Sequence, residues 1–290
     1  MRVVLPETPL YVRRRLALRR VRRLARPVDQ TVAGVLRAVE LALRGELEPD
    51  EKEWVRRIER IRRRLCDSRE PVTLTDFGAV PADSAAERRA AQEDDAPSGV
   101  VVTQTVGERC RSSKSPLAAL LLFRFVRELR PYRCLELGTN LGVSAAYQAA
   151  ALRLNGGGEL HTIEGAGSLA QLSRANLESL QLASVEVYEG RFTDVLPAVL
   201  ARTEPLDYAF VDGHHDGPAT VGYFARLHPS LRPGALVVFD DIAWSAGMAE
   251  AWTALEADRR VRASVNLGGM GVCVVGGDGE RFRVDLPIPG

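Results

Sequence analysis

Acidic side chains follow three of the apolar segments that we predict to be buried strands. Glu164 ends one of these segments, Asp212 ends another, and the neighbouring Asp240 and Asp241 end a third. In an open α/β sheet the carboxyl ends of parallel strands share one edge, and ligands bind outside that edge. We therefore expect these four carboxylates to face a common cleft.

The positions of the carboxylates suit two kinds of ligand. Glu164 follows a glycine-containing turn by roughly 20–30 residues, a spacing typical of an acidic residue that binds ribose hydroxyls. Asp212, Asp240 and Asp241 offer hard oxygen ligands, which favour Mg²⁺, Mn²⁺ or Ca²⁺ over zinc. Without a cation, such carboxylates would repel and raise one another's pKa. The simpler alternative is that they only cap or charge the helices that follow their strands.

Two histidines, His214 and His215, closely follow Asp212. An unperturbed histidine titrates near pH ~6.5, so it can accept a hydroxyl proton at neutral pH. Trp244 comes soon after Asp240 and is predicted to form a wall of a substrate pocket, with an ordinary core position as the alternative.

The first element that must position these residues is the stretch 134–144. An apolar segment stops at Gly138, and Gly142 precedes an alanine-rich segment. This pattern predicts a strand, a tight turn and a helix, the first βα unit of a doubly wound sheet. The turn would direct backbone N–H groups at a ligand, and Gly138 would let that ligand approach the backbone.

From this unit onward, strand-like and helix-like segments alternate. We expect strands at 133–137, 159–164, 185–189, 206–212 and 235–240, and helices at 143–154, 168–181, 193–201, 218–231 and 246–258. Two further strand-like runs, 261–267 and 271–275, have no helix between them. The fold class is therefore α/β: a Rossmann-like, mostly parallel sheet of seven strands with one antiparallel strand.

The region before the sheet differs in composition. Residues 1–70 form an Arg-rich helical extension, with helices predicted at 11–26 and 28–44 and a third beginning at Pro49. This extension is either an accessory layer with solvated arginines or a cationic face for an acidic partner such as a carrier protein, RNA or a membrane surface. Residues 71–112 are predicted to be a linker or lid, and residues 113–290 the α/β domain. A helix over 117–129 is expected to open this domain, with Ser115 as its N-cap.

Bulk composition limits the class of protein. The chain is 46% hydrophobic and 27% charged, as expected for a soluble globular protein. Its four cysteines lack metal-ligand spacing, which favours reduced thiols in a cytoplasmic protein. No apolar run reaches the roughly 20 residues that span a bilayer, so no membrane span is expected. The basic N-terminus lacks the continuous apolar segment of a signal peptide.

Five segments together resemble class I S-adenosylmethionine-dependent methyltransferases in order and spacing: 134–144, 162–165, 189–194, 210–216 and 239–244. Within this class, the sequences Phe-Val-Asp-Gly-His-His and Phe-Asp-Asp-Ile-Ala-Trp are similar to the cation-dependent O-methyltransferase family of catechol and caffeoyl-CoA type. The resemblance covers about residues 110–280 and leaves the Arg-rich N-terminal third outside.

The resemblance implies a binding site for the cofactor. Glu164 would bind the ribose, Ser113 would close over the cofactor, and Glu136 would lie beneath its methionine part. The methionine part would be lined by Gly138, Thr139, Asn140, Gly142 and Ser144, and the adenine flanked by Gly190, Arg191 and Phe192.

The resemblance also implies a catalytic centre next to the cofactor. Asp212, Asp240 and Asp241 would bind a divalent cation, most simply Mg²⁺, although the family generally has Asn where this chain has Asp241. His215 falls where the family has a catalytic lysine, and we predict that it acts as the base beside Asp212. His214 is predicted to be a loop residue at the substrate wall.

We therefore predict a cytoplasmic S-adenosylmethionine-dependent O-methyltransferase that uses a divalent cation to methylate a small hydroxylated molecule in secondary metabolism. Relatives of this type often form dimers, so a homodimer is one expected assembly. The alternatives are a metal-independent enzyme with His215 as base, an RNA-modifying enzyme that docks through the Arg-rich helix, and a non-catalytic binding module. A nicotinamide dehydrogenase is disfavoured because the turn lacks Gly-x-Gly-x-x-Gly.

Overall fold

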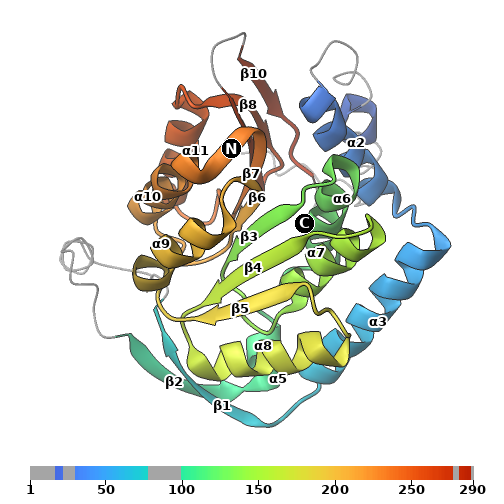
Figure 1. The fold of residues 1–290 in the computed structure, drawn as a ribbon, viewed down its shortest axis with the longest axis vertical. Coiled ribbons are helices and arrows are strands. Elements are labelled where there is room, and N and C mark those ends of the chain that lie inside the picture. Colours follow the sequence, from blue (N-terminus) through green and yellow to red (C-terminus); the bar gives the residue numbers. More distant parts are fainter. Residues whose placement is uncertain (1–16, 22–29, 78–98, 277–280, 289–290) are drawn as a thin grey trace, which may run out of the picture.

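A computed structural model describes residues 17–21, 30–77, 99–276 and 281–288 of the 290-residue chain (Figure 1). The helices are α2 (Gln30–Arg44), α3 (Pro49–Cys66), α5 (Val106–Cys110), α6 (Pro116–Leu129), α7 (Val143–Leu154), α8 (Gly167–Ser179), α9 (Phe192–Thr203), α10 (Gly217–Leu227) and α11 (Ala246–Ala257). The strands are β1 (Pro71–Asp76), β2 (Val100–Thr105), β3 (Arg133–Leu137), β4 (Glu159–Glu164), β5 (Val185–Glu189), β6 (Leu206–Val211), β7 (Leu231–Asp240), β8 (Val261–Asn266), β9 (Met270–Val275) and β10 (Phe282–Asp285).

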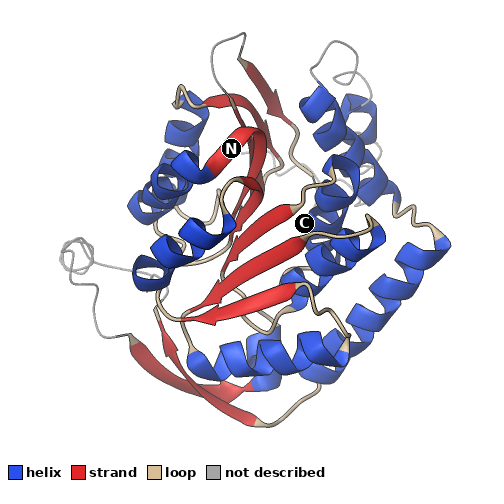
Figure 2. Cartoon of the chain, in the orientation of Figure 1, coloured by secondary structure: helices blue, strands red, loops and turns tan. Residues whose placement is uncertain are grey.

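Eight strands form one twisted sheet in the order β10-β8-β9-β7-β6-β3-β4-β5 (Figure 2). The strands from β7 to β5 are mutually parallel, β9 is antiparallel to both of its neighbours, and β10 is parallel to β8. This confirms the predicted doubly wound, mostly parallel sheet. The eighth strand, β10, was not predicted, because its four residues pair only at the sheet edge and bury little.

Helices cover both faces of the sheet, as crossovers between parallel strands require. Figure 1 shows α9, α10 and α11 on one face and α6, α7 and α8 on the other. Each face has its own apolar core, one containing Phe224 and Trp252 and the other containing Phe123 and Tyr147. None of the described helices has the length and apolar character that crossing a membrane requires.

The N-terminal helices pack on the outer side of the layer formed by α6, α7 and α8. Helix α2 packs against α6, and α3 packs against α7 and α5. Glu51 of α3 is buried and pairs with Arg124 and Arg127 of α6, each at 2.9 Å. Burial by itself raises the pKa of Glu51, but its hydrogen bonds and the two arginines lower it overall. The predicted helix over 11–26 lies mostly outside the described residues, of which 17–21 are helical.

The predicted linker region 71–112 contains an antiparallel pair, β1 and β2, which is separate from the main sheet. Strand β1 packs against α8. Thr105 and Glu108 form a capping box at the start of α5. Within this predicted linker, residues 78–98 lie outside the described residues.

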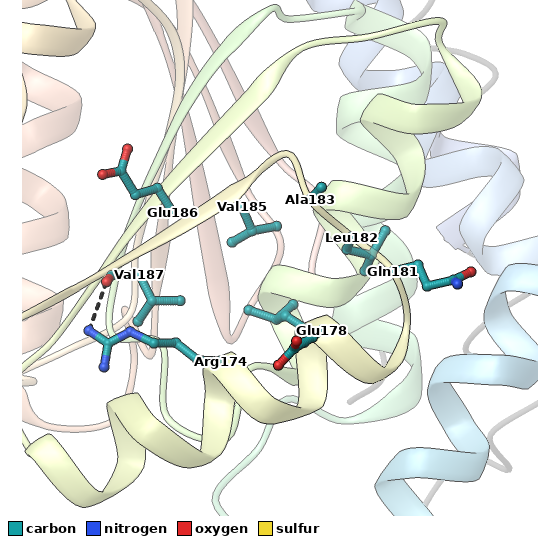
Figure 3. A pocket seen from close by; sticks show the side chains of 9 residues that line it. Arg174, Glu178, Gln181, Leu182, Ala183, Val185, Glu186 and Val187 are labelled. Carbon is teal, nitrogen blue, oxygen red and sulfur yellow. Dashed lines mark hydrogen bonds between the residues drawn. The ribbon is translucent and has the colours of Figure 1, made fainter.

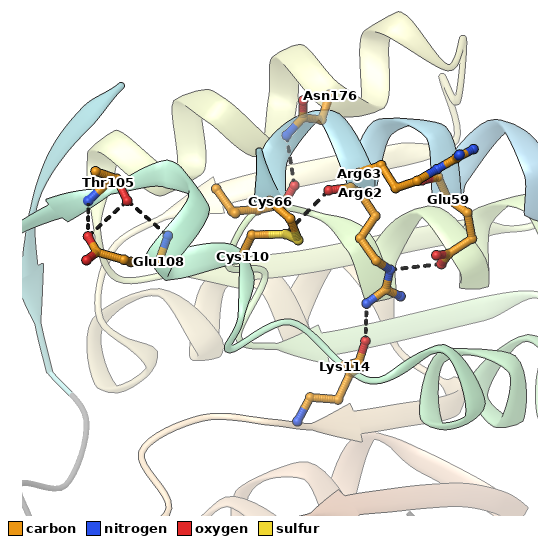
Figure 4. Close-up of a disulfide and its surroundings, with 10 residues drawn as sticks. Glu59, Arg62, Arg63, Cys66, Thr105, Glu108, Cys110, Lys114 and Asn176 are labelled. Carbon is orange, nitrogen blue, oxygen red and sulfur yellow. Dashed lines mark hydrogen bonds and ion pairs between the residues drawn. A yellow bond between two sulfur atoms is a disulfide. The ribbon is translucent and has the colours of Figure 1, made fainter. Parts of the chain in front are cut away.

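Cys66 and Cys110 form a disulfide between the end of α3 and the end of α5 (Figure 4). The expectation of four reduced thiols was therefore wrong for this pair. The two cysteines are 44 residues apart, and only the packing of α3 against α5 brings their Cα atoms to 5.2 Å, a distance that a disulfide spans. Cys134 and Cys273 are free and buried, as expected.

Candidate active site

The carboxyl ends of three neighbouring strands form the base of the site. The N–H of Gly138 donates to the Ile163 carbonyl at 3.0 Å, and the N–H of Asp212 donates to the Leu137 carbonyl at 2.8 Å. Gly138 has φ +102°, and a Cβ there would lie 2.0 Å from the carbonyl oxygen of Asp212. We expected a glycine at this turn for ligand approach, but it is also required because β3 and β6 meet there.

Glu164 lies beside the glycine turn, at the end of β4. Its carboxylate accepts the backbone N–H of Asn140 at 2.7 Å and that of Ala166 at 3.0 Å. Burial raises the pKa of Glu164, and the two backbone N–H groups act in the opposite direction. The structure therefore places Glu164 against the turn, where a ligand on the turn would meet its carboxylate.

Glu136 lies on β3 beneath the same turn and is fully buried. Its carboxylate accepts the side-chain amide of Gln148 at 2.8 Å and the hydroxyl of Thr162 at 2.7 Å. The Thr162 hydroxyl also contacts that of Thr139 at 2.6 Å, so the network reaches the turn itself. Burial raises the pKa of Glu136 to about 7, although its hydrogen bonds, including one with Ser144, oppose the shift.

We expect Glu136 to make the stability of the protein fall as pH rises. The usual pKa of a glutamate in the unfolded chain is 4.5, and the folded value is about 7. Between these two pH values the folded protein binds more protons at Glu136 than the unfolded chain does. The contribution of Glu136 to the free energy of unfolding therefore falls by up to about 3 kcal/mol as pH rises, and it levels off above about pH 7. Urea unfolding at pH 5 and pH 8 measures this loss.

The matched variant is Glu136→Gln, which stays neutral and can still accept a hydrogen bond from Thr162. Its free energy of unfolding should change less between the two pH values than that of the wild-type protein. Other titrating groups contribute to both proteins and cancel in the comparison. An equal loss in both proteins would contradict the assignment to Glu136.

Three aspartates, Asp212, Asp240 and Asp241, form an acidic cluster at the ends of β6 and β7, and a lysine lies inside this cluster. The Lys114 Nζ atom is 3.0 Å from Asp212 Oδ1 and also makes an ion pair with Asp240 Oδ2. The side chains of these three residues are only 8–13% exposed. No role for Lys114 is predicted from the sequence.

Burial and charge act together on this cluster. Burial and the charge of Asp212 raise the pKa of Asp240 to about 7, and Lys114 opposes the shift. Burial by itself lowers the pKa of Lys114, but the charges of Asp212 and Asp240 raise it overall. Lys114 therefore remains charged at neutral pH.

His215 lies between two of the aspartates at the open side of the cluster. Its Nε2 atom is 4.0 Å from Asp212 Oδ1, and its Nδ1 atom is 3.5 Å from Asp241 Oδ2. The indole of Trp244 is 51% exposed, and its ring centroid is 5.7 Å from that of His215. The site thus combines an accessible imidazole, two carboxylates and an exposed aromatic wall.

His214 faces a different environment. Its Nδ1 atom is 3.0 Å from the Tyr223 hydroxyl, and burial lowers the pKa of His214.

Four residues of the site that are not glycine have positive φ angles: Asn140, His214, His215 and Asp241. Such conformations often cluster at functional sites, where the surrounding structure maintains them.

The predicted metal ligands Asp212, Asp240 and Asp241 do come together, but they do not fit a divalent cation in the expected way. The Lys114 ammonium occupies the position between Asp212 and Asp240. A different set, Asp212, His215 and Asp241, offers ligand atoms within 4.8 Å of one another.

The residues predicted to flank the adenine lie on the side of the site near β4 and β5. The N–H of Gly190 donates to the Glu164 carbonyl at 2.9 Å. The ring of Phe192 packs against Gly213, where a Cβ would be 2.7 Å away. The guanidinium of Arg191 lies 5.6 Å from the ring centroid of Phe77.

Phe77 is a second residue near the site that is not predicted from the sequence. It follows β1, outside the segments that carry the family resemblance, and its ring lies against Gly165. Phe77 thus places the end of β1 next to the residues that are predicted to flank the adenine. No local pattern marks this residue, because its position depends on how β1 packs against α8.

Ser113 and Lys114 come from the loop before α6. The Ser113 hydroxyl is shielded from solvent and has no hydrogen-bond partner among the described residues. Ser115 caps α6, as predicted. The sequence does set Lys114 apart from the other basic residues. Of the 39 lysines and arginines in the chain, only Lys52 and Lys114 are lysines.

A separate surface hollow lies near the start of the edge strand β5 (Figure 3). Its walls come from the end of α8, the following loop and β5, and include Arg174, Glu178 and Glu186. No predicted site residue lines this hollow. The candidate site is therefore the acidic edge of the sheet, not this hollow.

Comparison with known proteins agrees with this architecture. Residues 135–242 match the family model of a methyltransferase domain. A catechol O-methyltransferase of Niastella koreensis is 34% identical over 110 residues, which is 37% of this chain and 48% of that protein. The chain thus spans about half the length of this curated relative.

Solved structures give the same fold. The O-methyltransferase TomG from Streptomyces achromogenes, involved in tomaymycin synthesis and solved in complex with SAM, is 29% identical with a TM-score of 0.51; the match covers 57% of this chain and 82% of that one. The SAH-bound methyltransferase PaMTH1 from Podospora anserina is 18% identical with a TM-score of 0.50, covering 58% and 82%, and shows the fold alone.

A doubly wound sheet with a glycine turn after β3 and an acid at the end of β4 is the architecture typical of Rossmann-like nucleotide-cofactor domains. Within that class, residues 135–242 are similar to a methyltransferase domain. The resemblance to the catechol type of O-methyltransferase is confirmed.

Proposed function

We propose that the protein transfers a methyl group from S-adenosylmethionine to a hydroxyl of a small molecule. The observation that carries this proposal is that Glu164, Asp212 and His215 lie at one sheet edge beside the glycine turn. The similarity to a catechol O-methyltransferase and to TomG supports O-methylation.

The residues present fit the cofactor. We assign its ribose to Glu164, whose carboxylate is already oriented by two backbone N–H groups. The unpartnered hydroxyl of Ser113 supports a polar ligand at this position. The methionine part is assigned to the turn and the adenine to the flank of Gly190 and Arg191, with Phe77 beside it.

The cofactor supplies an activated methyl group on sulfur, so the protein must align the acceptor oxygen and remove its proton. We assign proton removal to His215. The neighbouring carboxylates of Asp212 and Asp241 stabilise the imidazolium that forms when His215 accepts the proton. The exposed ring of Trp244 would hold a flat acceptor against this imidazole.

A metal-assisted version is a second candidate. The observation that favours it is the close approach of ligand atoms from Asp212, His215 and Asp241. In that version His215 would bind the cation and could not be the base. Activity in the presence of excess EDTA distinguishes the two candidates.

Two measurements test the proposed function. Isothermal titration calorimetry with S-adenosylmethionine and S-adenosylhomocysteine should show binding of both. Transfer of a labelled methyl group should then occur to at least one member of a panel of catechols and other phenols. Absence of cofactor binding by the folded protein would refute the proposal.

A further inference from the structure

We propose that Lys114 provides the positive charge that holds Asp212 and Asp240 together, in place of a divalent cation, and that it acts directly on the acceptor oxygen. This inference rests on the proposed function. Its geometric basis is the position of the ammonium, which contacts one carboxylate oxygen of each aspartate in a nearly closed environment.

The fold holds Lys114 in place from the backbone. The Lys114 carbonyl accepts a hydrogen bond from Arg62 of α3, which is itself paired with Glu59 at 2.8 Å (Figure 4). On the other side, Ser115 caps α6. The disulfide joins α3 to α5 just before this loop. Lys114 is therefore anchored by the N-terminal helices as well as by its own ion pairs.

A divalent cation and the Lys114 ammonium cannot occupy this position together. Both need the same oxygens of Asp212 and Asp240, and their positive charges repel at short range in a site of reduced dielectric constant. To bind a cation between these aspartates, the protein would have to move Lys114 out of a buried double ion pair. Removing one partner of such a pair is strongly unfavourable.

The arrangement also gives Lys114 a chemical role. An ammonium has three N–H donors, and the two aspartates take two of them. Lys114 and His215 both approach Asp212 Oδ1, at 3.0 and 4.0 Å, so they flank the same space. The third N–H can donate to the acceptor oxygen while His215 takes its proton.

The proposed step balances in atoms and charge. The acceptor O–H bond breaks and its proton goes to His215, while the oxygen forms a bond to the methyl carbon. The carbon–sulfur bond breaks at the same time, which leaves S-adenosylhomocysteine and a methyl ether. Lys114 keeps its protons and stabilises the developing negative charge on oxygen, as preorganised donors do.

The test uses Mn²⁺ as a probe and needs no methyl acceptor. Electron paramagnetic resonance follows Mn²⁺ binding to the wild-type protein, Lys114→Met and Lys114→Arg. Lys52→Met is the matched control, because Lys52 is the only other lysine in the sequence and is exposed on α3. Circular dichroism checks that each variant is folded.

We expect Lys114→Met to bind Mn²⁺ at least about tenfold more tightly than wild type, because the aspartates have lost their cation. Adding Asp240→Asn should abolish this gain. Lys114→Arg and Lys52→Met should behave like wild type. If Lys114→Met does not fold, wild type and the single variant Asp240→Asn still decide the matter, since equally weak Mn²⁺ binding supports the proposal. Tighter binding by wild type would overturn it.

Activity provides an independent arm. Methyl transfer by wild type should be unaffected by EDTA, whereas Lys114→Met should lose roughly 100-fold in rate with EDTA and regain part of it with Mg²⁺. Loss of wild-type activity in EDTA would overturn the inference. If no acceptor is methylated but Mn²⁺ binding follows the expected pattern, the proposed function fails and the place of Lys114 as the resident cation stands.

Discussion

Replacing Glu164 with alanine is expected to weaken the binding of S-adenosylmethionine by about 100-fold or more. A carboxylate that accepts hydrogen bonds from both ribose hydroxyls makes two charge-assisted contacts, each contributing roughly 1.5–3 kcal/mol. Since every ~1.4 kcal/mol is a factor of ten in affinity, the loss of both gives this magnitude. Isothermal titration calorimetry with S-adenosylhomocysteine measures the change in Kd without turnover.

Two further variants separate this contact from a structural effect. Glu164→Gln keeps an oxygen that can accept from the Asn140 N–H, so it should retain the turn and lose only part of the affinity. Glu186→Gln changes an exposed glutamate on the neighbouring strand β5 and should leave the Kd unchanged. Unaltered affinity in a folded Glu164→Ala protein would rule out the ribose assignment.

Much of the fold could be predicted because it depends on local patterns. The strands over 133–137, 159–164 and 185–189 and the helix over 143–154 have the predicted bounds. Buried parallel strands are short apolar runs, and their crossover helices have apolar faces, so both are visible in a window of about ten residues. The acids at the ends of β4, β6 and β7 then come together because parallel strands end at the same edge.

The features that were missed depend on contacts between distant residues. Lys114 meets Asp212 and Asp240 across 98 and 126 residues of sequence. The metal prediction rested on the carboxylates alone for this reason, because the lysine that pairs with Asp212 and Asp240 comes from another part of the chain. The disulfide of Cys66 and Cys110 and the position of Phe77 likewise follow from the packing of the N-terminal elements.

The N-terminal helices consequently have a closer relation to the site than their composition suggests. Glu51 ties α3 to α6, and Arg62 of the same helix holds the carbonyl of Lys114. At least one arginine of these helices therefore has a structural role. The predicted accessory layer with solvated arginines did not include such a role. The Arg-rich helix predicted over 11–26 lies mostly outside the described residues. An acidic partner for the N-terminal extension stays a prediction, as do a homodimer and a cytoplasmic location.

Replacing His215 with alanine is expected to lower kcat by about 10²–10⁴, the usual contribution of a positioned general base. We assign the imidazole as the proton acceptor of this site, because the Lys114 ammonium already holds its protons and Asp212 is paired with it. The Kd for S-adenosylhomocysteine should not change, since Glu164 and the turn are untouched. Initial rates at saturating cofactor, together with calorimetry, distinguish the two effects.

The matched control is His228→Ala, a histidine at the end of α10 that contacts none of the site residues described above. It should retain wild-type kcat. Because Lys114 and His215 share Asp212 Oδ1, Asp212→Asn should reduce kcat as well, through loss of the charge that favours both the ammonium and the imidazolium. If His215→Ala retains full activity, a base elsewhere or a metal-bound acceptor must do this work, and the EDTA experiment then separates those two possibilities.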